Sequence, residues 1–582
     1  MKIKLELSEW FYNMGLVGFN RILKKAEEDD LIKLNDYNYN SEENFLEFEN
    51  TLLENFHEYY FNYFFNRYDV HERTSKQLHQ WFIISKKEEK FESALKVIKD
   101  TIKKINDKIK KYDEEAFMKS DEIYKTLSKV KKYDNLNEVE KCIEDFLNVL
   151  SKENINKKLT LNMFKFILSS SFFGQVSFLN VVSTNKSLQE QKDIMFKDYI
   201  KPILEEINLN ENIQGNAEEV FLNIKEALKT VLSKDIEKVY KTIEKNFIKK
   251  KKNADEIRNF IDGNEYHTCS LCCNNKSFGG TYAEGSFTPL AVSADNSKNM
   301  FWEFNTEYPI CNLCKLVLFC TPAGCIDIYK NYMGKDVDIE NKHYFAFVNM
   351  DTNFDELCKY NNNLEGKKDK ENPYKEFIID IVEELQQKSA WQLQNILFVE
   401  FNADYSSKKS KMNYFNMPKY VALYFAKSSK SISAVKDELF KSELIDNILS
   451  GKDIKFIIDK KLRDCIKKNN NYAYDCFNGV IIRNTLSNFR GGYENMEGKT
   501  VENKNEQDAK RLYVIYARGQ ELNEYFKESN AENKISSIAY RLLNSAKANN
   551  KNEFMDTLIR VHISAQKEIP AIFFGSSNLV VV

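Results

Sequence analysis

Four cysteines occur as two closely spaced pairs near the middle of the sequence. Cys269 and Cys272 lie in HTCSLC, and Cys311 and Cys314 lie in CNLC. Two intervening residues allow a tight turn to direct both sulfur atoms of a pair at one metal ion, about 2.3 Å away. Four thiolates favour zinc, with an iron–sulfur centre as the alternative. The spacing therefore predicts a four-cysteine site that leaves no position for water and is structural rather than hydrolytic.

The segment between the two pairs is long and contains the glycine-bearing stretch GGTYAEGS at 279–286. Closing such a loop is entropically unfavourable, and a metal ion at its base offsets that cost. In small zinc modules the metal contributes on the order of 10 kcal/mol of apparent folding free energy. We therefore expect the metal to shape a protruding loop.

The sequence offers few other groups with recognisable chemistry. It contains no GxxxxGK[ST] phosphate-binding loop and no HExxH motif, and its six histidines are scattered. Carboxylates are abundant, but abundance without a positioned partner does not indicate catalysis. We therefore expect no enzymatic activity. The alternative is a zinc-stabilised nuclease or nucleotidyl-modifying enzyme with a carboxylate metal site hidden in the strands of 343–427.

Composition and charge limit the class of protein. The 582 residues include 85 basic and 87 acidic residues, for a net charge of −2. A protein that alone holds long nucleic acids usually has a basic surplus, so any such contact should be local or shared with partners. The charged N-terminus and the cysteine pattern favour a reducing cytoplasm. No apolar run approaches the ~20 residues of a membrane span.

Hydrophobic periodicity predicts a multidomain α+β protein that is mostly helical. Residues 2–6 and the stretches 343–351, 395–404 and 419–427 have the character of strands, and 377–388 that of a helix. Leu313–Cys320 has the character of a buried strand or core segment, and Ser8 is expected to cap the first helix. We expect an N-terminal, largely helical α+β domain (1–260), a zinc-binding module (261–330), a β-rich region (331–427) and a C-terminal helical bundle (428–582).

Three separated parts of the chain resemble one protein family. They are SEWFYNMGLVGFNRIL (8–23), SFFGQVSFLN (171–180) and the two cysteine pairs. Together they are similar to the CXXC-CXXC family of large subunits in type I-B CRISPR effector complexes (Cascade). The length and the order of elements fit that family over essentially the whole chain. Paired CxxC motifs alone are common among zinc proteins, and their conjunction with this N-terminus makes the resemblance specific.

The resemblance implies a non-catalytic subunit of an RNA-guided surveillance complex in antiviral defence. In that family the large subunit lies near the 5′ end of the guide RNA and helps to recognise the motif that flanks the target in duplex DNA. It also helps to open the duplex, after which a separate helicase–nuclease is recruited to cut. The implied partners are the guide RNA, the target DNA, the backbone and other subunits of the complex, and that helicase–nuclease. The C-terminal helical region resembles the small subunit.

Candidate nucleic-acid contacts can be proposed from residue chemistry. Glycine permits close approach to the backbone and glutamine can hydrogen-bond a base edge, although FGQ is also compatible with a simple turn. A lysine run before the first cysteine pair could neutralise phosphates, or could be a solvated helix end. The candidates are Gly174, Gln175, Ser177, Lys249, Lys250, Lys251, Lys252, Arg258 and Arg490.

Overall fold

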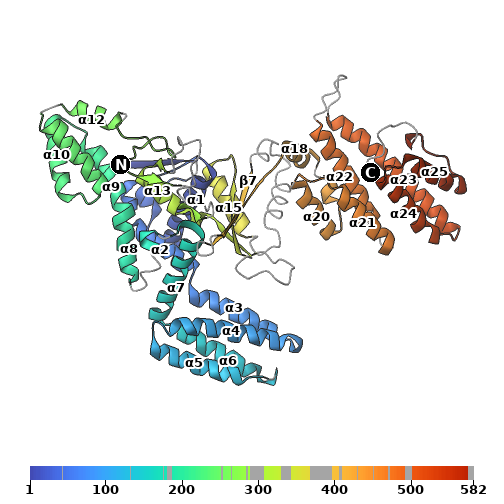
Figure 1. Cartoon of the computed structure of the whole chain (residues 1–582), viewed down its shortest axis with the longest axis horizontal. Coiled ribbons are helices and arrows are strands. Elements are labelled where there is room, and N and C mark those ends of the chain that lie inside the picture. The colour runs from blue at the N-terminus through green and yellow to red at the C-terminus, as the bar shows by residue number, and fades with distance from the viewer. Residues whose placement is uncertain are drawn as a thin grey trace.

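The computed structural model confirms a mostly helical α+β protein with several cores. It describes residues 1–41, 44–131, 133–174, 176–179, 186–250, 253–263, 265–283, 286–288, 307–329, 343–366, 396–404, 409–428, 430–449, 451–468, 472–491 and 501–573. Within these ranges the strands form two two-stranded sheets and one four-stranded sheet. Figure 1 shows a central body that contains the sheet, with separate groups of helices around it.

The N-terminal strand and first helix belong to the central body. Strand β1 (Lys2–Glu6) alternates exposed and buried residues and pairs antiparallel with β2 (Phe45–Glu49), as the sequence predicts for 2–6. Helix α1 (Trp10–Glu28) is buried along most of its length. The helix begins one residue later than predicted, because Glu9 rather than Ser8 is the N-cap and accepts hydrogen bonds from Phe11 N and Tyr12 N.

A bundle of helices extends from the central body below it in Figure 1. Its hydrophobic core draws on α3 to α6 and the first turns of α7, and is separate from the core of the central body. Aromatic residues of α2, including Phe56, Tyr60 and Phe64, are fully buried in the central core, so they serve packing. Helix α2 (Phe56–Arg67) thus belongs to the central body. The helices of the bundle are α3 (Val70–Ser85), α4 (Phe91–Ile109), α5 (Glu114–Lys129), α6 (Leu136–Leu150) and the start of α7 (Glu153–Leu168).

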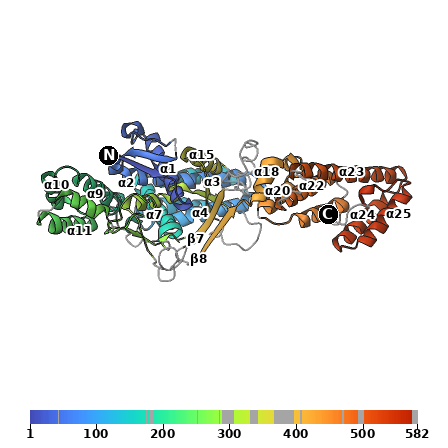
Figure 2. The same cartoon turned by 90° about the horizontal axis from the view of Figure 1, so that it is seen from above.

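A second group of helices lies at the opposite end from the C-terminal helices (Figures 1 and 2). Its core is formed by the end of α9 together with α10, α11 and α12. In the sequence, helix α8 follows α7 and precedes this group. The bounds are α8 (Leu188–Met195), α9 (Lys201–Asn212), α10 (Ala217–Thr230), α11 (Lys234–Ile243) and α12 (Ala254–Asp262).

The four-stranded sheet joins two hydrophobic cores. Its order is β5-β6-β7-β8 and all neighbours are antiparallel. Phe345 and Phe401 point into the core that holds α1, whereas Tyr344 and Phe398 point into the core shared with the C-terminal helices. Alternation along each strand thus gives the sheet two buried faces. The elements are β5 (Ile326–Tyr329), β6 (His343–Asn349), α15 (Phe354–Glu365), β7 (Leu397–Asp404) and β8 (Lys409–Asn416).

The strand predictions of this region have two different outcomes. β6 and β7 confirm the strands predicted at 343–351 and 395–404, but 419–427 forms helix α18 (Lys419–Ser428), not a strand. Its buried residues Val421, Ala422, Tyr424 and Phe425 follow a helical spacing of three and four residues. The short run of apolar residues had resembled a strand because it is dense in β-branched and aromatic types. The helix predicted at 377–388 lies outside the described residues.

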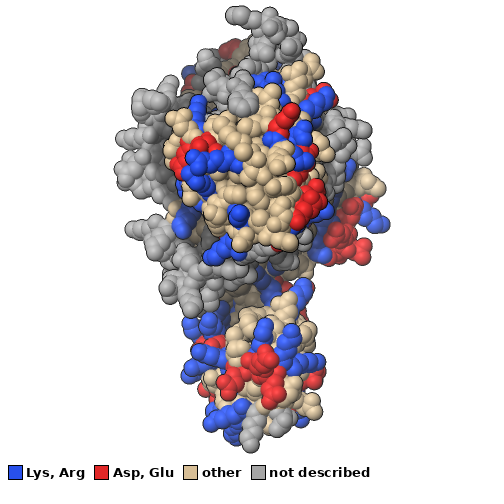
Figure 3. Space-filling view, turned by 90° about the vertical axis from the view of Figure 1, so that its right-hand side faces the viewer, with Lys and Arg blue, Asp and Glu red and all other residues tan. Residues whose placement is uncertain are grey.

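The described residues after α18 are mostly helical, as predicted, and form the C-terminal end of the molecule (Figure 1). Figure 3 views this end and shows lysine and arginine interspersed with acidic side chains around a largely uncharged face. Among the described residues, no helix has both the length and the apolar character needed to cross a membrane. The helices are α19 (Lys430–Ser433), α20 (Glu438–Leu449), α21 (Lys455–Lys468), α22 (Ala473–Arg490), α23 (Val501–Glu528), α24 (Asn533–Lys547) and α25 (Lys551–Ser564).

Candidate metal centre

The first cysteine pair lies in a tight turn. An isolated bridge between Thr268 and Lys276 closes the turn, and Cys269 N donates to Asn275 O at 2.8 Å. Cys273 N donates to Cys269 O at 3.0 Å, and Cys273 itself has a φ of 52°, in the left-handed region. These backbone bonds bend the chain so that Cys269 and Cys272 can direct their sulfur atoms to one point.

The second pair lies at the start of a helix. Cys311 is the N-cap of α13 (Asn312–Phe319), and its sulfur accepts a hydrogen bond from Cys314 N at 3.4 Å. The partial positive charge of a helix N-terminus favours thiolates over thiols. The segment Leu313–Cys320, predicted as a buried strand or core segment, lies in this helix through Phe319. Its residues are buried on nearly every side, which removes the periodicity that would have distinguished helix from strand.

A short sheet brings the two pairs together. Strands β3 (Thr281–Tyr282) and β4 (Tyr308–Pro309) are antiparallel, with Tyr282 opposite Tyr308. Ser270 N also donates to Pro309 O at 2.9 Å, which ties the first turn to the second strand. As a result, the sulfur atoms of Cys269, Cys272, Cys311 and Cys314 all lie within 4.8 Å of one another. Sequence spacing alone had grouped these four residues, and the structure brings all four together.

The four sulfur atoms share protons through mutual hydrogen bonds, which act differently on the four cysteines. Cys269, Cys311 and Cys314 are buried and Cys272 is half-buried. Hydrogen bonds from Cys272, Cys311 and Cys314 lower the pKa of the Cys269 thiol, whereas hydrogen bonds with Cys269 and Cys272, together with burial, raise the pKa values of Cys311 and Cys314. Asn275 Nδ2 donates to Cys311 Sγ at 3.7 Å and adds a further dipole to the cluster. A divalent cation would replace the protons that the sulfur atoms otherwise share.

The donor set fits a structural metal ion. Four thiolates complete a tetrahedral shell, so that no position remains for a substrate or water. Within the described part of the chain, this cluster is the one group of three or more potential ligands that could hold a metal ion. The neighbouring Cys273 is exposed and lies outside the cluster, and Cys320 and Cys325 donate to backbone carbonyls in the core. The site thus uses four of the eleven cysteines.

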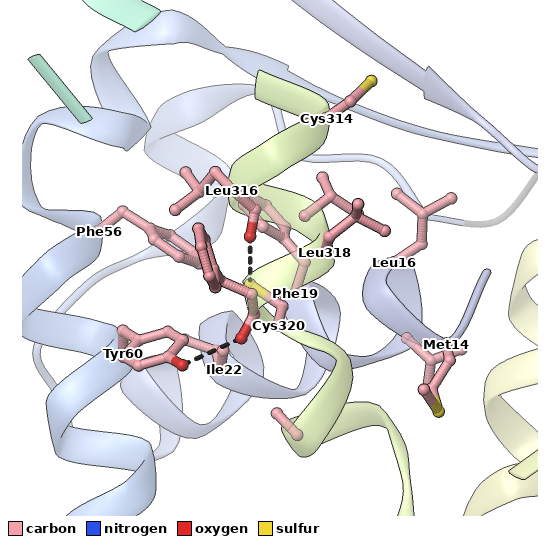
Figure 4. Packing of buried hydrophobic residues seen from close by; sticks show 14 of the residues in the cluster. Met14, Leu16, Phe19, Ile22, Phe56, Tyr60, Cys314, Leu316, Leu318 and Cys320 are labelled. Atoms are coloured by element: carbon pink, nitrogen blue, oxygen red, sulfur yellow. Dashed lines mark hydrogen bonds between the residues drawn. The ribbon is translucent and has the colours of Figure 1, made fainter. Parts of the chain in front are cut away.

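Helix α13 carries the second pair into the central core. Figure 4 shows Leu316, Leu318 and Cys320 packed among Phe19, Phe56 and Tyr60, with Cys314 at the other end of the helix. Tyr60 Oη donates to Phe319 O at 3.0 Å. The metal centre is therefore built on the same core as α1 and α2 rather than on a core of its own.

The residues that fix α13 and the next helix, α14 (Thr321–Gly324), against α1 were not predicted from the sequence. The backbones approach so closely that a Cβ atom at Gly18 would lie 1.9 Å from Cys320 O, and one at Gly324 would lie 1.9 Å from Met14 O. Arg21 Nη1 donates to Gly324 O at 3.0 Å. The available signal was the pair of glycines inside the helical pattern GLVG (15–18), since glycine in a helix requires a packing reason.

Tyr12 connects α1 directly to the cysteine cluster. Cys314 Sγ donates to Tyr12 Oη at 3.6 Å, and both side chains are buried. Burial, followed by the charge of Cys314, raises the pKa of the Tyr12 hydroxyl well above its usual value. The hydroxyl therefore stays protonated and can donate to a metal-bound thiolate.

Replacing Tyr12 with phenylalanine is expected to lower metal affinity about tenfold, as loss of a hydrogen bond to a ligand commonly does. Competition with a chromogenic chelator measures this change. Tyr60→Phe is the matched control, because it removes a hydroxyl that binds the same helix but not a sulfur atom. Equal affinities of the Tyr12→Phe variant and the unmodified chain would contradict the role given to Tyr12.

None of the described candidate nucleic-acid residues belongs to the cysteine cluster. Gly174 has φ 64° and ψ −144°, a conformation that requires glycine, and ends the π-helical turn η5 (Ser169–Phe173). Ser177 is exposed and donates to Tyr199 Oη at 3.3 Å. Arg490 is exposed at the end of α22 and lies over the Tyr420 ring at 5.5 Å. Gln175, Lys251 and Lys252 lie outside the described residues.

The three described basic candidates near α12 differ in availability. Lys249 and Lys250 are exposed, and Lys249 pairs with Glu244 at 3.6 Å. Arg258 is held within the protein: its guanidinium donates to Ile213 O at 2.9 Å, to Gly215 O and to Asp255. These bonds tie α12 to the end of α9. Arg258 therefore has a structural task, and its contact with nucleic acid stays a prediction.

Comparison with known proteins bears on the region just described. Residues 262–326 match a protein family described as CRISPR-associated protein (Cas_CXXC_CXXC). The matched range runs from the end of α12 to the first residue of β5 and contains all four clustered cysteines. The match supports a CRISPR-associated protein. No curated protein matched the chain, and no solved structure did so.

Proposed function

We propose that this chain is the large subunit of a type I-B CRISPR surveillance complex, and that it acts without catalysis of its own. Its task would be to help recognise the motif flanking the target in duplex DNA, to help open the duplex, and to recruit a helicase–nuclease. The guide RNA, the target DNA and the other subunits would be its partners, in the cytoplasm. The observation that carries the proposal is the family match over the cysteine cluster.

The character of the metal site supports a binding rather than a catalytic role. Four thiolates leave no open coordination position, so the metal would act by fixing structure. We propose zinc as the metal, since zinc is the common partner of four cysteines in paired CxxC motifs. The ion would hold the two cysteine pairs together beside α1, and thereby set the position of β3 and β4 for a partner.

The charge of the chain also supports a shared nucleic acid. With a net charge of −2, the chain is expected to contribute local contacts while other subunits hold most of the RNA. In RNA-guided complexes, base pairing reads the target sequence and the protein needs to read only a short duplex motif. Phosphate contacts then fix the register of the duplex, and few side chains reach base edges.

The decisive experiment measures binding and cleavage together. The complex of guide RNA and subunits is assembled with and without this chain, and is given duplex targets whose flanking motif is randomised. We expect motif-selective binding that requires both the guide and this chain, with no cutting until a helicase–nuclease is added. A guide without complementarity to the target provides the control.

Two results would contradict the proposal. One is motif selection by the complex that lacks this chain. The other is metal-dependent cutting by the isolated chain, which would instead favour a nuclease or nucleotidyl-modifying enzyme with a carboxylate metal site. Sequencing the bound fraction of the randomised targets detects the first result, and gel analysis of the same targets detects the second.

A further inference from the structure

A lysine is buried in α7. Lys165 is only 2% exposed, whereas lysine is almost never fully buried unless it is paired. Within the described part of the chain, its ammonium group has no hydrogen-bond or ion-pair partner. An uncompensated charge in this position destabilises the fold. Among the described residues, no acidic side chain pairs with it, and an anion from outside the chain would favour its charged form.

The surroundings of Lys165 are positively charged. Burial, and then the charges of Lys158 and Lys186, lower the pKa of Lys165 to about 8. Lys158 lies two turns earlier on α7, and Lys186 directly precedes Ser187, the N-cap of α8. Both are half-buried and reach solvent. The nearby Glu190 is engaged in the capping box of α8, where it accepts from Ser187 N at 2.6 Å.

Helix α8 contributes a second unpartnered group. The side chain of Gln191 is fully buried, and neither its amide nitrogen nor its amide oxygen has a hydrogen-bond partner among the described residues. Buried amides without partners are rare and destabilising. Both α7 and α8 pack against the short helical turn η6 (Ser177–Leu179), which follows Gly174. Two helices that flank one segment thus each carry a buried polar group that lacks a partner.

These observations point to a ligand with negative charge and several acceptor oxygens. We propose that Lys165, Lys158 and Lys186 bind a phosphate group of a nucleic-acid backbone. Lys158 and Lys186 would meet the phosphate at the surface, and Lys165 would supply a charge-assisted hydrogen bond from the interior. The assignment to nucleic acid rests on the proposed function. It adds residues from α7 and the start of α8 to the segment that holds Gly174 and Ser177.

Replacing Lys165 with methionine tests this site in the full-length chain, without guide RNA or other subunits. The probe is a fluorescein-labelled single-stranded oligonucleotide, and binding is followed by anisotropy over a range of salt concentrations. We expect affinity to fall about tenfold or more, with a shallower dependence of the logarithm of affinity on the logarithm of salt concentration. The variant should unfold at the same or a higher temperature, because an unpaired buried charge is removed.

Lys157→Met is the matched control on the same helix. Lys157 is exposed and pairs with Glu153, so its removal should leave affinity unchanged. Lys186→Ala, outside the helices, gives a second variant whose folding is not at risk and whose affinity should also fall. Unchanged affinity of the Lys165→Met and Lys186→Ala variants, or an equal loss in the control, would overturn the proposal.

A second arm separates nucleic acid from free phosphate. Inorganic phosphate is added to the unmodified chain and to Lys165→Met at constant ionic strength, and thermal unfolding is recorded. Stabilisation of the unmodified chain alone, together with loss of oligonucleotide binding in the variant, supports the site as proposed. Stabilisation by phosphate without any change in oligonucleotide affinity would assign the site to a free phosphate and overturn the nucleic-acid assignment. Because no guide is present, these results do not depend on motif recognition.

Discussion

Replacing Cys311 with serine is expected to abolish stoichiometric metal binding and to destabilise the central body strongly. Cys311 is fully buried, caps α13 and accepts hydrogen bonds from Cys314 N and Asn275 Nδ2. In small zinc modules the metal contributes about 10–16 kcal/mol of apparent folding free energy. We therefore expect the free energy of unfolding to fall by several kcal/mol. Elemental analysis and thermal unfolding, with and without a chelator, measure both effects.

The control for this variant lies next to a ligand in the sequence. Cys273→Ser changes an exposed thiol outside the cluster, so metal content and unfolding temperature should be retained. Metal retained by Cys311→Ser, or lost from Cys273→Ser, would contradict the assignment of ligands. Visible absorption of the purified chain identifies the metal: an iron–sulfur centre absorbs strongly, and zinc does not. A colourless chain with about one zinc ion would match the predicted site.

The metal site was predictable because its signal is local and specific. Two residues between the cysteines of each pair are sufficient to name the four ligands, whichever fold surrounds them. The alternation of Lys2–Glu6 likewise identified β1, since one face of that strand is buried and the other is not. Where a pattern reflects one-sided burial, sequence alone locates the element.

One strand prediction failed, and one open choice was decided by the structure. The strand predicted at 419–427 is helix α18, because the run is short and dense in β-branched and aromatic residues. The segment 313–320, predicted as a buried strand or core segment, is helical through Phe319 and is buried on nearly every side, so it carries no clear period. The burial of Lys165 could not be predicted either, because it depends on elements that pack against α7, and the pattern of a helix does not reveal them. Tertiary context decides such features.

The close approach of α1 to α13 is another tertiary feature, and it leads to the second large effect. Gly18→Ala is expected to lower the free energy of unfolding by about 3 kcal/mol, at the upper end of overpacking costs. The added methyl group would meet the backbone at Cys320 O, which cannot rotate away as a flexible side chain could. Denaturant unfolding of the metal-loaded chain measures the change.

The same substitution should also weaken metal binding. Separating the helices moves α13, which carries Cys314 and is capped by Cys311, away from Tyr12 on α1. Gly519→Ala in α23 is the control, since nothing lies within 4 Å of the methyl group it would add, and removing a helical glycine should stabilise by about 0.5–1 kcal/mol. If Gly18→Ala were as stable as the unmodified chain, the two helices could separate freely. The metal centre would then not depend on α1 for its position.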